Sequence, residues 1–307
     1  MSTGDLSKIE LNDIQIERAG IYSLLDQLEI SLRINFTDRV ERLVDEVVFS
    51  TDWGTYKYSR LKNDQIFIED LDRECGIRVD AKRENMTVWV KDEQQIDRRL
   101  WHELIRHGIS AYLSDCGCTP IHAAAVVAPN GYTWMIAGQT HSGKSTLVLG
   151  LLAAGWQFLS DDSLILRAED GQIVAYGWLG TSLLNPILIQ TYPHLSDKLG
   201  LAVGERKLID LKRCYPTQPV YKAQPQGLLF PYFSPDVSIA KLEPISSGTT
   251  LGNLMTHAAT SLIERPQPHL VNLQQLAFGC EYFNLALGKT LQTQPALIAE
   301  VLIDHHS

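Results

Sequence analysis

The sequence has no apolar run long enough to cross a bilayer, because Gly, Asp or His interrupts its longest apolar stretches. It begins with Met1-Ser2-Thr3-Gly4-Asp5 and shows neither the basic patch nor the apolar core of a signal peptide. The cysteines are odd in number and scattered, which fits reduced thiols better than a disulfide framework. These absences predict a cytoplasmic protein with no membrane partner.

Basic charge is also scarce in this chain. Lys and Arg number 27 against 36 Asp and Glu, and most of the acidic excess lies before Cys118. Nucleic acid requires a basic stripe on its partner, so the charge argues against a nucleic-acid partner. With 307 residues, 45% of them apolar, the composition indicates a folded globular protein that is long enough for two units.

The first part of the chain alternates apolar and polar residues, which predicts strands. The segments are Leu28–Phe36, Gln65–Leu71 and Met86–Val90. From Glu93 to Ser114 apolar residues recur every three or four positions, which is typical of an amphipathic helix. Asp115–Pro120 then breaks the helix. We therefore predict a strand-rich N-terminal domain over residues 1–118 and a second domain over residues 119–307.

The second domain has the strand and helix order of an α/β fold. The predicted strands are Ile121–Ala128, Tyr132–Ala137, Trp156–Leu159, Ser163–Arg167, Gln172–Gly177, Lys207–Leu211 and Ser238–Leu242. The predicted helices are Lys144–Ala154, Thr249–Arg265, Leu270–Leu287 and Pro295–His305. Asn130-Gly131 and Asp170-Gly171 are typical of hairpin turns.

One motif matches the complete phosphate-loop pattern G-x-x-x-x-G-K-S/T, between a predicted buried strand and a predicted helix. It is Gly138-Gln139-Thr140-His141-Ser142-Gly143-Lys144-Ser145, followed by Thr146. In such loops backbone N–H groups and the helix N-terminus surround phosphates. Lys144 would contact the β- and γ-phosphates, and Ser145 would bind Mg²⁺. The alternative, a glycine turn before an ordinary helix, is disfavoured by the complete pattern, so we predict ATP and Mg²⁺ as cofactors.

Two carboxylates, Asp161 and Asp162, follow the predicted strand Trp156–Leu159. Ligand-binding groups gather at the carboxyl ends of strands in open α/β sheets, so both side chains should face the phosphates. One can bind the metal and the other can accept a proton from a hydroxyl group, whereas the alternative is a solvated turn. His122, by its spacing alone, is more typical of a structural histidine.

Three segments together resemble a known family. Ile121–Val127, Gly138–Thr146 and Ala154–Asp162 are similar to the catalytic core of the bacterial HPr serine kinase/phosphorylase. They resemble even more the shorter HPr-kinase-like proteins found with peptide-modification genes. The resemblance implies a P-loop domain of the HPr kinase/phosphoenolpyruvate carboxykinase type. It also implies that Lys144 is catalytic, that Asp161 is the general base and that His122 orients or modulates Asp161. Asp162 would be the metal-side or structural partner, with Ser145 at the metal.

In the shorter relatives, a basic residue that precedes a strand also closes over the phosphates. Arg206 and Lys207 in the segment Gly204–Leu211 are the candidates here, and an ordinary polar loop is an equal alternative. The sequence departs from the full enzyme after the acidic pair. Gly177-Trp178-Leu179-Gly180-Thr181 stands where that enzyme has a Glu-x-Arg-Gly-Leu-Gly signature, and the front half and the tail also differ.

These features predict an ATP-dependent kinase that transfers the γ-phosphoryl group to a hydroxyl group. The favoured acceptor is a serine or threonine of a peptide or carrier protein, and a small hydroxylated metabolite is the alternative. A regulatory P-loop NTPase without an acceptor ranks lower, because the chain has no Leu-Ser-Gly-Gly-Gln signature. A nucleotide-binding protein without catalysis is disfavoured by the presence of Lys144, Ser145, Asp161 and Asp162. The resemblance leaves room for a homo-oligomer.

Overall fold

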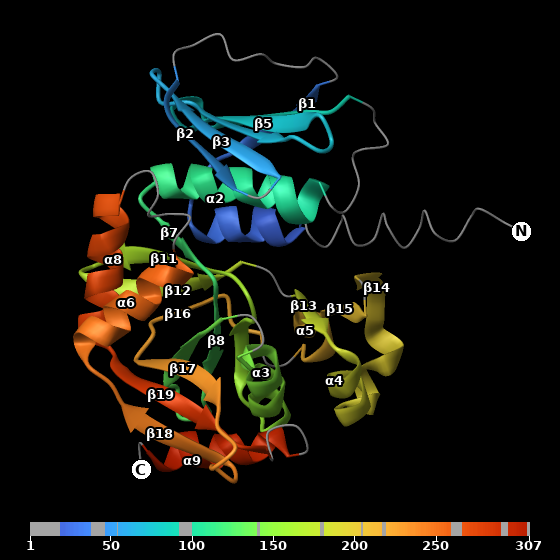
Figure 1. Cartoon of the computed structure of the whole chain (residues 1–307), viewed down its shortest axis with the longest axis vertical. Helices are drawn as coiled ribbons and strands as arrows, with labels where there is room; N and C mark the ends of the chain where they lie inside the picture. The colour runs from blue at the N-terminus through green and yellow to red at the C-terminus, as the bar shows by residue number, and fades with distance from the viewer. Residues whose placement is uncertain are drawn as a thin grey trace, which may run out of the picture. The chain divides into compact units, whose positions relative to one another are not determined.

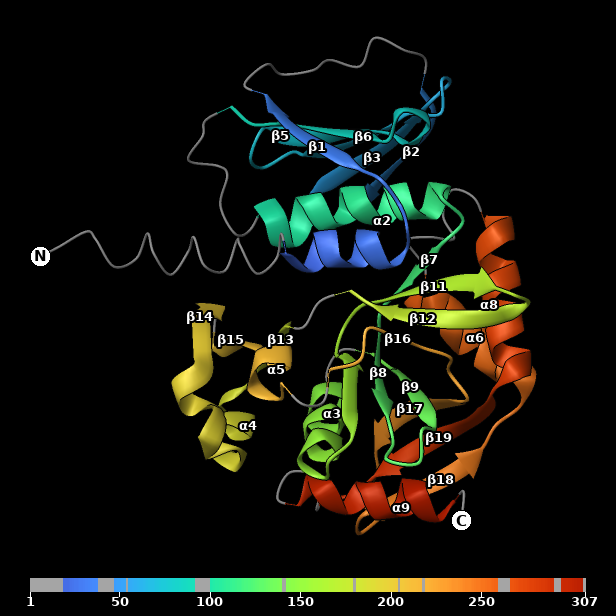
Figure 2. The same ribbon diagram turned by 180° about the vertical axis from the view of Figure 1, so that it is seen from behind.

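The structure is a computed structural model in which the chain divides into two compact units, Met1–Cys118 and Thr119–Ser307. It describes residues 19–37, 47–53, 55–91, 100–139, 142–178, 181–203, 205–216, 219–258, 266–289 and 294–305. Figures 1 and 2 show the elements of both units from opposite sides. In the described part of the chain, no helix combines the length and the apolar character that a membrane span requires.

The first unit contains one six-stranded sheet in the order β1-β6-β5-β4-β3-β2. Its strands are β1 (Arg33–Thr37), β2 (Val47–Trp53), β3 (Tyr56–Leu61), β4 (Ile66–Asp70), β5 (Cys75–Asp80) and β6 (Asn85–Trp89). A 3-10 turn η1 (Ala81–Arg83) precedes β6, and a π-helical turn η3 (Leu100–Ile105) leads into helix α2 (Arg106–Asp115). The helical residues 19–27, drawn in blue, lie with α2 on one face of this sheet (Figure 1).

The prediction of a strand over Leu28–Phe36 is wrong in its first half. Residues 19–27 are helical, and the strand begins only at Arg33. Four buried apolar residues recur at the three- and four-residue steps of a helix: Ile21, Leu24, Leu25 and Leu28. Leu28 ends the helical spacing and also begins the alternation of apolar and polar residues. The alternation therefore concealed the helix that precedes it.

The other predicted elements of this unit are confirmed in the described residues. Gln65–Leu71 and Met86–Val90 correspond to β4 and β6 within one residue at each end. The predicted helix over Glu93–Ser114 is confirmed from Leu100 onward, and residues 92–99 lie outside the described part.

The second unit is mixed α/β with three sheets. The main sheet has the order β10-β8-β9-β17-β19-β18, and the smaller ones are β16-β12-β11-β7 and β13-β15-β14. The strands are β7 (Thr119–Ile121), β8 (Ala123–Val127), β9 (Thr133–Ala137), β10 (Gln157–Ser160), β11 (Leu164–Glu169), β12 (Gln172–Gly177), β13 (Thr181–Leu184), β14 (Leu199–Val203), β15 (Arg206–Asp210), β16 (Lys222–Ala223), β17 (Gly227–Phe233), β18 (Ala240–Pro244) and β19 (Glu281–Leu287).

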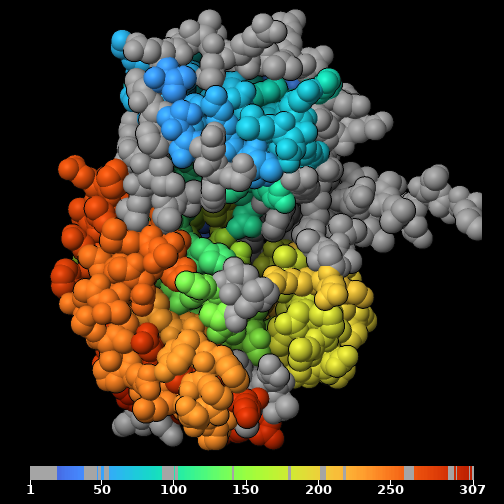
Figure 3. Space-filling view, in the orientation of Figure 1, coloured from blue at the N-terminus to red at the C-terminus, as the bar shows by residue number. Residues whose placement is uncertain are grey.

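Helices cover both faces of the main sheet. The helices of the second unit are α3 (Lys144–Ala153), α4 (Pro186–Thr191), α5 (Leu211–Cys214), α6 (Ser247–His257), α8 (Pro266–Gly279) and α9 (Ile298–Asp304), with 3-10 turns η4 (Pro193–Lys198) and η6 (Pro295–Leu297). One buried cluster packs α3 and α9 on one face, and a second packs α6 and α8 on the other. The three-stranded sheet, α4 and α5 form a lobe, drawn in yellow in Figure 3, whose Leu184, Leu188 and Ile209 join the cluster beneath α3.

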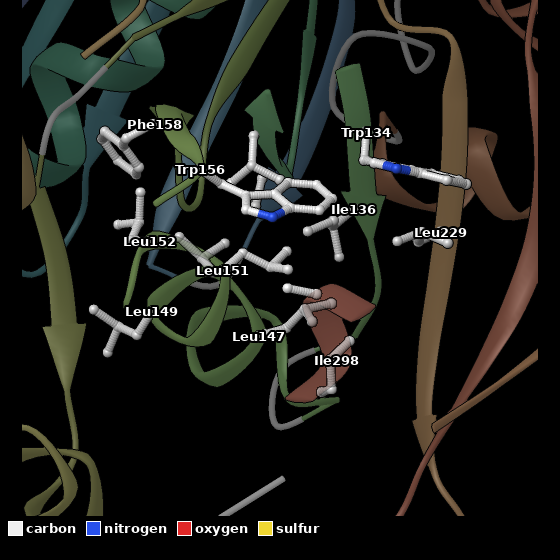
Figure 4. Packing of buried hydrophobic residues seen from close by; sticks show 14 of the residues in the cluster. Trp134, Ile136, Leu147, Leu149, Leu151, Leu152, Trp156, Phe158, Leu229 and Ile298 are labelled. Atoms are coloured by element: carbon white, nitrogen blue, oxygen red, sulfur yellow. The ribbon is translucent and has the colours of Figure 1, made fainter. Parts of the chain in front are cut away.

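The core beneath α3 fixes this helix against the main sheet. Figure 4 shows Leu147 and Leu151 of α3 packed with Trp156 and with Ile136 of β9. All four side chains are fully buried, and α3 is apolar on every side because the sheet, α9 and the β13 lobe surround it. The end of β9 and the start of α3 are thereby held in place, and the loop between them begins and ends at rigid elements.

The prediction of a helix over Leu270–Leu287 is wrong in its second half. Helix α8 ends at Gly279, and Glu281–Leu287 forms β19. Phe283, Leu285 and Leu287 alternate into the core beneath α3, which is the period of a strand. Because β19 lies between β17 and β18 in the main sheet, tertiary pairing decides its conformation.

The hairpins and the remaining helices agree with the sequence predictions. β8 and β9 pair antiparallel around Gly131, and β11 and β12 pair around Asp170-Gly171, all three turn residues having positive φ. Lys144–Ala154 is confirmed as α3, and Pro295–His305 as η6 and α9. Thr249–Arg265 is confirmed as α6 up to His257, and residues 259–265 lie outside the described part.

Candidate functional site

Strand directions bring three predicted site segments to one edge of the main sheet. β8 runs antiparallel to both β9 and β10, so the last residues of β9 and β10 lie at the same edge as the first residue of β8. The segment Gly138–Gly143, here called the glycine loop, leaves β9 at this edge. Asp161 and Asp162 follow β10, and His122 precedes β8. The topology therefore gathers the loop, both carboxylates and the histidine.

The described residues of the glycine loop are those that join it to β9 and to α3. Gly143 adopts a φ of 96° at the N-cap of α3, a conformation that favours glycine. A Cβ at Gly138 would lie 2.6 Å from Ser142 Oγ and 3.3 Å from Pro231 Cδ, so the loop returns close to its own start. Gln139 is exposed, and Ser145 and Thr146 are half-buried in the first turn of α3. Thr140 and His141 lie outside the described residues.

Lys144 is folded back onto the glycine loop. Its Nζ donates hydrogen bonds to the carbonyl oxygens of Gly138 at 2.6 Å and Gln139 at 3.3 Å. Burial lowers the pKa of Lys144, and the charges of Asp162 and Asp161 oppose that shift. A buried cation whose hydrogen bonds in the described residues go to neutral carbonyls would gain a stronger, charge-assisted partner from an anion entering the loop.

Asp161 is almost completely buried at the end of β10, with 3% of its surface exposed. Its Oδ2 accepts a hydrogen bond from the hydroxyl of Ser182 on β13. Burial raises the pKa of Asp161 to about 6, with Asp162 adding to the shift and Ser182, Ser145 and Lys144 opposing it. Its Oδ1, like the Oγ of Ser142, is buried without a hydrogen-bond partner among the described residues.

Asp162 differs from its neighbour because it is half exposed and pairs with His122. The distance from His122 Nδ1 to Asp162 Oδ1 is 3.2 Å, with 41% and 54% of the two side chains exposed. The resemblance implied that His122 acts on Asp161, but the structure places it against Asp162. The predicted strand Ile121–Ala128 is also divided at His122, because β7 belongs to a different sheet from β8. The interruption turns His122 toward the acidic pair.

Two further residues of the site were missed in the sequence. Ser182 holds Asp161 from β13, and His257 at the end of α6 accepts a hydrogen bond from the backbone N–H of His122 through its carbonyl, at 3.0 Å. The rings of His122 and His257 lie 6.4 Å apart. Burial, Lys144 and His122 lower the pKa of His257 to about 4, so its imidazole is neutral at pH 7. Neither residue belongs to a local motif, and only the folded chain brings them here.

Arg206 and Lys207 lie at the start of β15 in the three-stranded sheet. Arg206 is half-buried and Lys207 is exposed. Their connection to the acidic pair runs through β13, where Leu184 is opposite Lys207 and Ser182 is opposite Ile209. The candidate basic residues therefore belong to the same small sheet that supplies the hydrogen bond to Asp161.

The oxygen donors beside Lys144 suit one kind of metal. Among the described residues, no three His, Cys, Asp or Glu side chains come together as a metal cluster. The Ser145 hydroxyl interacts with the Asp161 carboxyl and lowers its pKa, and the Oδ1 of Asp161 has no hydrogen-bond partner among the described residues. Mg²⁺ prefers oxygen ligands and is usually held by one or two protein groups together with phosphates and water. The donors fit Mg²⁺ that arrives with a phosphate ligand.

Comparison with known proteins gives a distant likeness in structure. No family model matches the chain, and no curated protein does. Among solved structures, the chain is similar to the Hpr(Ser) kinase/phosphatase from Coxiella burnetii, with 16% sequence identity and a TM-score of 0.34. That match covers 61% of this chain and 95% of the other. What the chain does is therefore inferred from its own residues.

Proposed function

We propose that the second unit is an ATP-dependent kinase that transfers the γ-phosphoryl group to a hydroxyl group of an acceptor. The observation that carries this proposal is the convergence of Lys144, the buried Asp161 and the exposed Asp162–His122 pair beside the glycine loop. A cation for phosphates, an oxygen ligand for a metal and a solvent-facing carboxylate are the groups that phosphoryl transfer requires.

The phosphate groups would be held by the glycine loop and the first turn of α3. Because Gly143 has no side chain, no N-cap side chain competes for the first N–H groups of the helix, which point at the loop. Lys144 would exchange its two carbonyl partners for phosphate oxygens. Ser145 and Asp161 would hold Mg²⁺. Bound Mg·ATP supplies the phosphoryl group, and the metal neutralises charge that develops on it.

The exposure of the two carboxylates suggests a different division of roles from the one that the resemblance implied. Asp161 faces Ser182 and the loop and is closed to an acceptor, so we assign it to the metal with Ser145. Asp162 is open to solvent, and we assign it as the general base, oriented by His122. Asp162 would take the proton of the acceptor hydroxyl while that oxygen bonds to the γ-phosphorus and ADP leaves.

The exposed pair also bears on the acceptor. A base and its orienting histidine that are both about half exposed can receive a side chain presented by another chain. We therefore favour a serine or threonine of a peptide or carrier protein, with a small hydroxylated metabolite as the alternative. Arg206 or Lys207 remains the candidate for stabilising charge during transfer.

Incubation with Mg·ATP and a panel of Ser/Thr peptides and hydroxylated metabolites tests the proposal. Mass spectrometry should detect the addition of one phosphoryl group to an acceptor. Asp162→Asn should lower transfer about 10²- to 10⁴-fold and leave nucleotide binding intact, because a general base contributes that much. Asp170→Asn is the matched control, since Asp170 lies in a hairpin turn and Asn tolerates its positive φ. Undiminished transfer by Asp162→Asn would remove its role as base, and acceptor-independent ATP hydrolysis alone would favour a regulatory NTPase.

A further inference from the structure

The strand order of the main sheet determines the direction in which a bound nucleotide extends from the glycine loop. This inference rests on the proposed function. β8 and β10, which place His122 and the two carboxylates, lie on one side of β9. β17 and β19 lie on its other side and run parallel to it, so their carboxyl ends reach the same edge. A nucleotide whose γ-phosphate faces Asp162 must extend its base toward the ends of β17 and β19.

β17 passes directly beside the glycine loop. It pairs with β9 up to Leu229 opposite Ile136, and Pro231 Cδ lies 3.3 Å from the position of a Cβ on Gly138. Phe233 is the last residue of β17, two positions after Pro231. β17 therefore places an aromatic side chain two residues beyond the point where it lies beside the start of the glycine loop.

The side chain of Phe233 lies on the face of the sheet that carries α3. Leu229 belongs to the core beneath α3, whereas Leu228 and Phe230 belong to the opposite core, so alternation assigns Phe233 to the α3 face. It is 58% exposed. Tyr232 occupies the other face and donates a hydrogen bond from its hydroxyl to Glu243 on β18 at 2.7 Å. Phe233 therefore exposes a large apolar ring on the side where the glycine loop enters the helix.

The neighbouring strand β19 leaves more than half of the Phe233 side chain exposed. Leu287 is opposite Phe233 on β19 and is buried, and the next residue is Gly288. Leu287 belongs to the core beneath α3, so it lies on the same face of the sheet as Phe233, and the Phe233 ring remains 58% exposed beside it.

We propose that Phe233 is the platform on which the base of the bound nucleotide stacks. Stacking uses the face of the base rather than its hydrogen-bonding edge, so the platform accepts adenine and guanine alike. The contact contributes to affinity for the nucleoside and leaves the phosphates to Lys144 and the glycine loop. The expected contribution is roughly tenfold in the dissociation constant, as for single aromatic–base stacks.

Calorimetric titration of the full chain with Mg·ATP and with Mg·tripolyphosphate separates the base from the phosphates. Phe233→Ala should weaken ATP binding roughly tenfold and leave tripolyphosphate binding unchanged, whereas Phe233→Trp should retain ATP binding. Phe278→Ala is the matched control, because Phe278 is 77% exposed on α8, on the opposite face of the sheet. Phe278→Ala should leave the affinity for both ligands unchanged.

Each other result overturns a defined part of the inference. Unchanged ATP affinity in Phe233→Ala overturns the platform and leaves the kinase intact. Equal weakening of both ligands also overturns it, because the substitution would then act on the glycine loop. If neither ligand binds the unsubstituted protein, the proposed function itself fails and the platform fails with it.

Discussion

Asp161 and Asp162 are adjacent in the sequence, yet the fold gives them opposite surroundings. Asp161 is held by Ser182 inside the protein, where burial raises its pKa to about 6. Asp162 stands half in solvent against His122. Under the proposed function, these surroundings suit Asp161 to a metal, at the oxygen that has no hydrogen-bond partner among the described residues, and Asp162 to an acceptor. The position of the pair after a strand could be predicted from the sequence, whereas the difference in exposure could not.

Asp161→Asn should stabilise the protein at neutral pH when metal and nucleotide are absent. The pKa of Asp161 is raised from 3.8 to about 6, so the folded state binds the proton more tightly than the unfolded state. Stability contributed by this group is complete below about pH 4 and is lost as pH rises through about 6. Asn has no charge to bury. Above pH 7 the variant should gain roughly 3 kcal/mol over the original protein.

Chemical denaturation between pH 4 and pH 8, in the presence of EDTA, measures this difference. The gain of Asp161→Asn should be near zero at pH 4 and should grow to its full size above pH 7. The reason is that the Asp161 carboxyl of the original protein ionises in this range, whereas the variant has no carboxyl at this position. A gain that is constant over this range would show that ionisation of Asp161 does not destabilise the folded protein.

Ser182→Ala should destabilise the protein more at pH 8 than at pH 4. The Ser182 hydroxyl is a hydrogen-bond donor to Asp161, and it lowers the pKa of that carboxyl. A hydrogen bond to a charged group contributes about 2 kcal/mol, which is lost only while Asp161 is ionised. A double-mutant cycle with Asp161→Asn checks the assignment. An equal cost of Ser182→Ala in both backgrounds would show that the two side chains are not coupled.

Among the elements, those with complete local signals were the predictable ones. The β8–β9 and β11–β12 hairpins have their turn residues, and α3 begins after a glycine with positive φ and is apolar from Leu147 onward. β19 was predicted as a helix, because its apolar residues fit both periods and only its place between β17 and β18 distinguishes them.

The residues of the candidate site also fall into two groups, those that a local sequence motif reveals and those that only the fold brings together. The glycine loop and the acidic pair are contiguous in sequence, so a motif reveals them. Ser182 and His257 come from other elements, and the contact of His122 with Asp162 depends on the break between β7 and β8. No local pattern encodes a contact that the pairing of distant strands creates.

Gly177→Ala should destabilise the second unit through β10. A Cβ at Gly177, the last residue of β12, would lie 2.1 Å from the carbonyl oxygen of Leu159, so β10 and the carboxylates after it must shift. Forcing an extra methyl group into such a contact costs about 1–3 kcal/mol or more. Thermal unfolding and ATP titration measure the loss of stability and the accompanying loss of affinity.

The same substitution at Gly252 provides the control. Gly252 lies exposed inside α6 with nothing within 4 Å of an added Cβ, so alanine there should stabilise the helix by about 0.5–1 kcal/mol. Opposite signs at the two positions would attribute the effect of Gly177→Ala to the close approach of β10. A loss at both positions would contradict this explanation.

At the scale of the whole molecule, each unit has its own core. In the first unit, Arg60 forms two hydrogen bonds to Asp115, at 2.8 and 3.2 Å, and both side chains are buried. In the second unit, Thr119 Oγ1 lies 3.0 Å from both His269 Nδ1 and Asn272 Nδ2, which ties β7 to α8. The glycine loop, the acidic pair, His122 and Phe233 all belong to the second unit.

A protein of residues 116–307 should therefore fold and bind Mg·ATP with the affinity of the full chain. It retains both buried clusters of the main sheet and the Thr119–His269–Asn272 contacts at its new start. Circular dichroism and calorimetric titration test folding and binding separately. Lys144→Ala in this fragment should abolish most of the binding, because its charge would be missing from the loop. A folded fragment that no longer binds Mg·ATP would show that Met1–Cys118 contributes to the nucleotide site, whereas intact binding would show that nucleotide binding does not require the first unit.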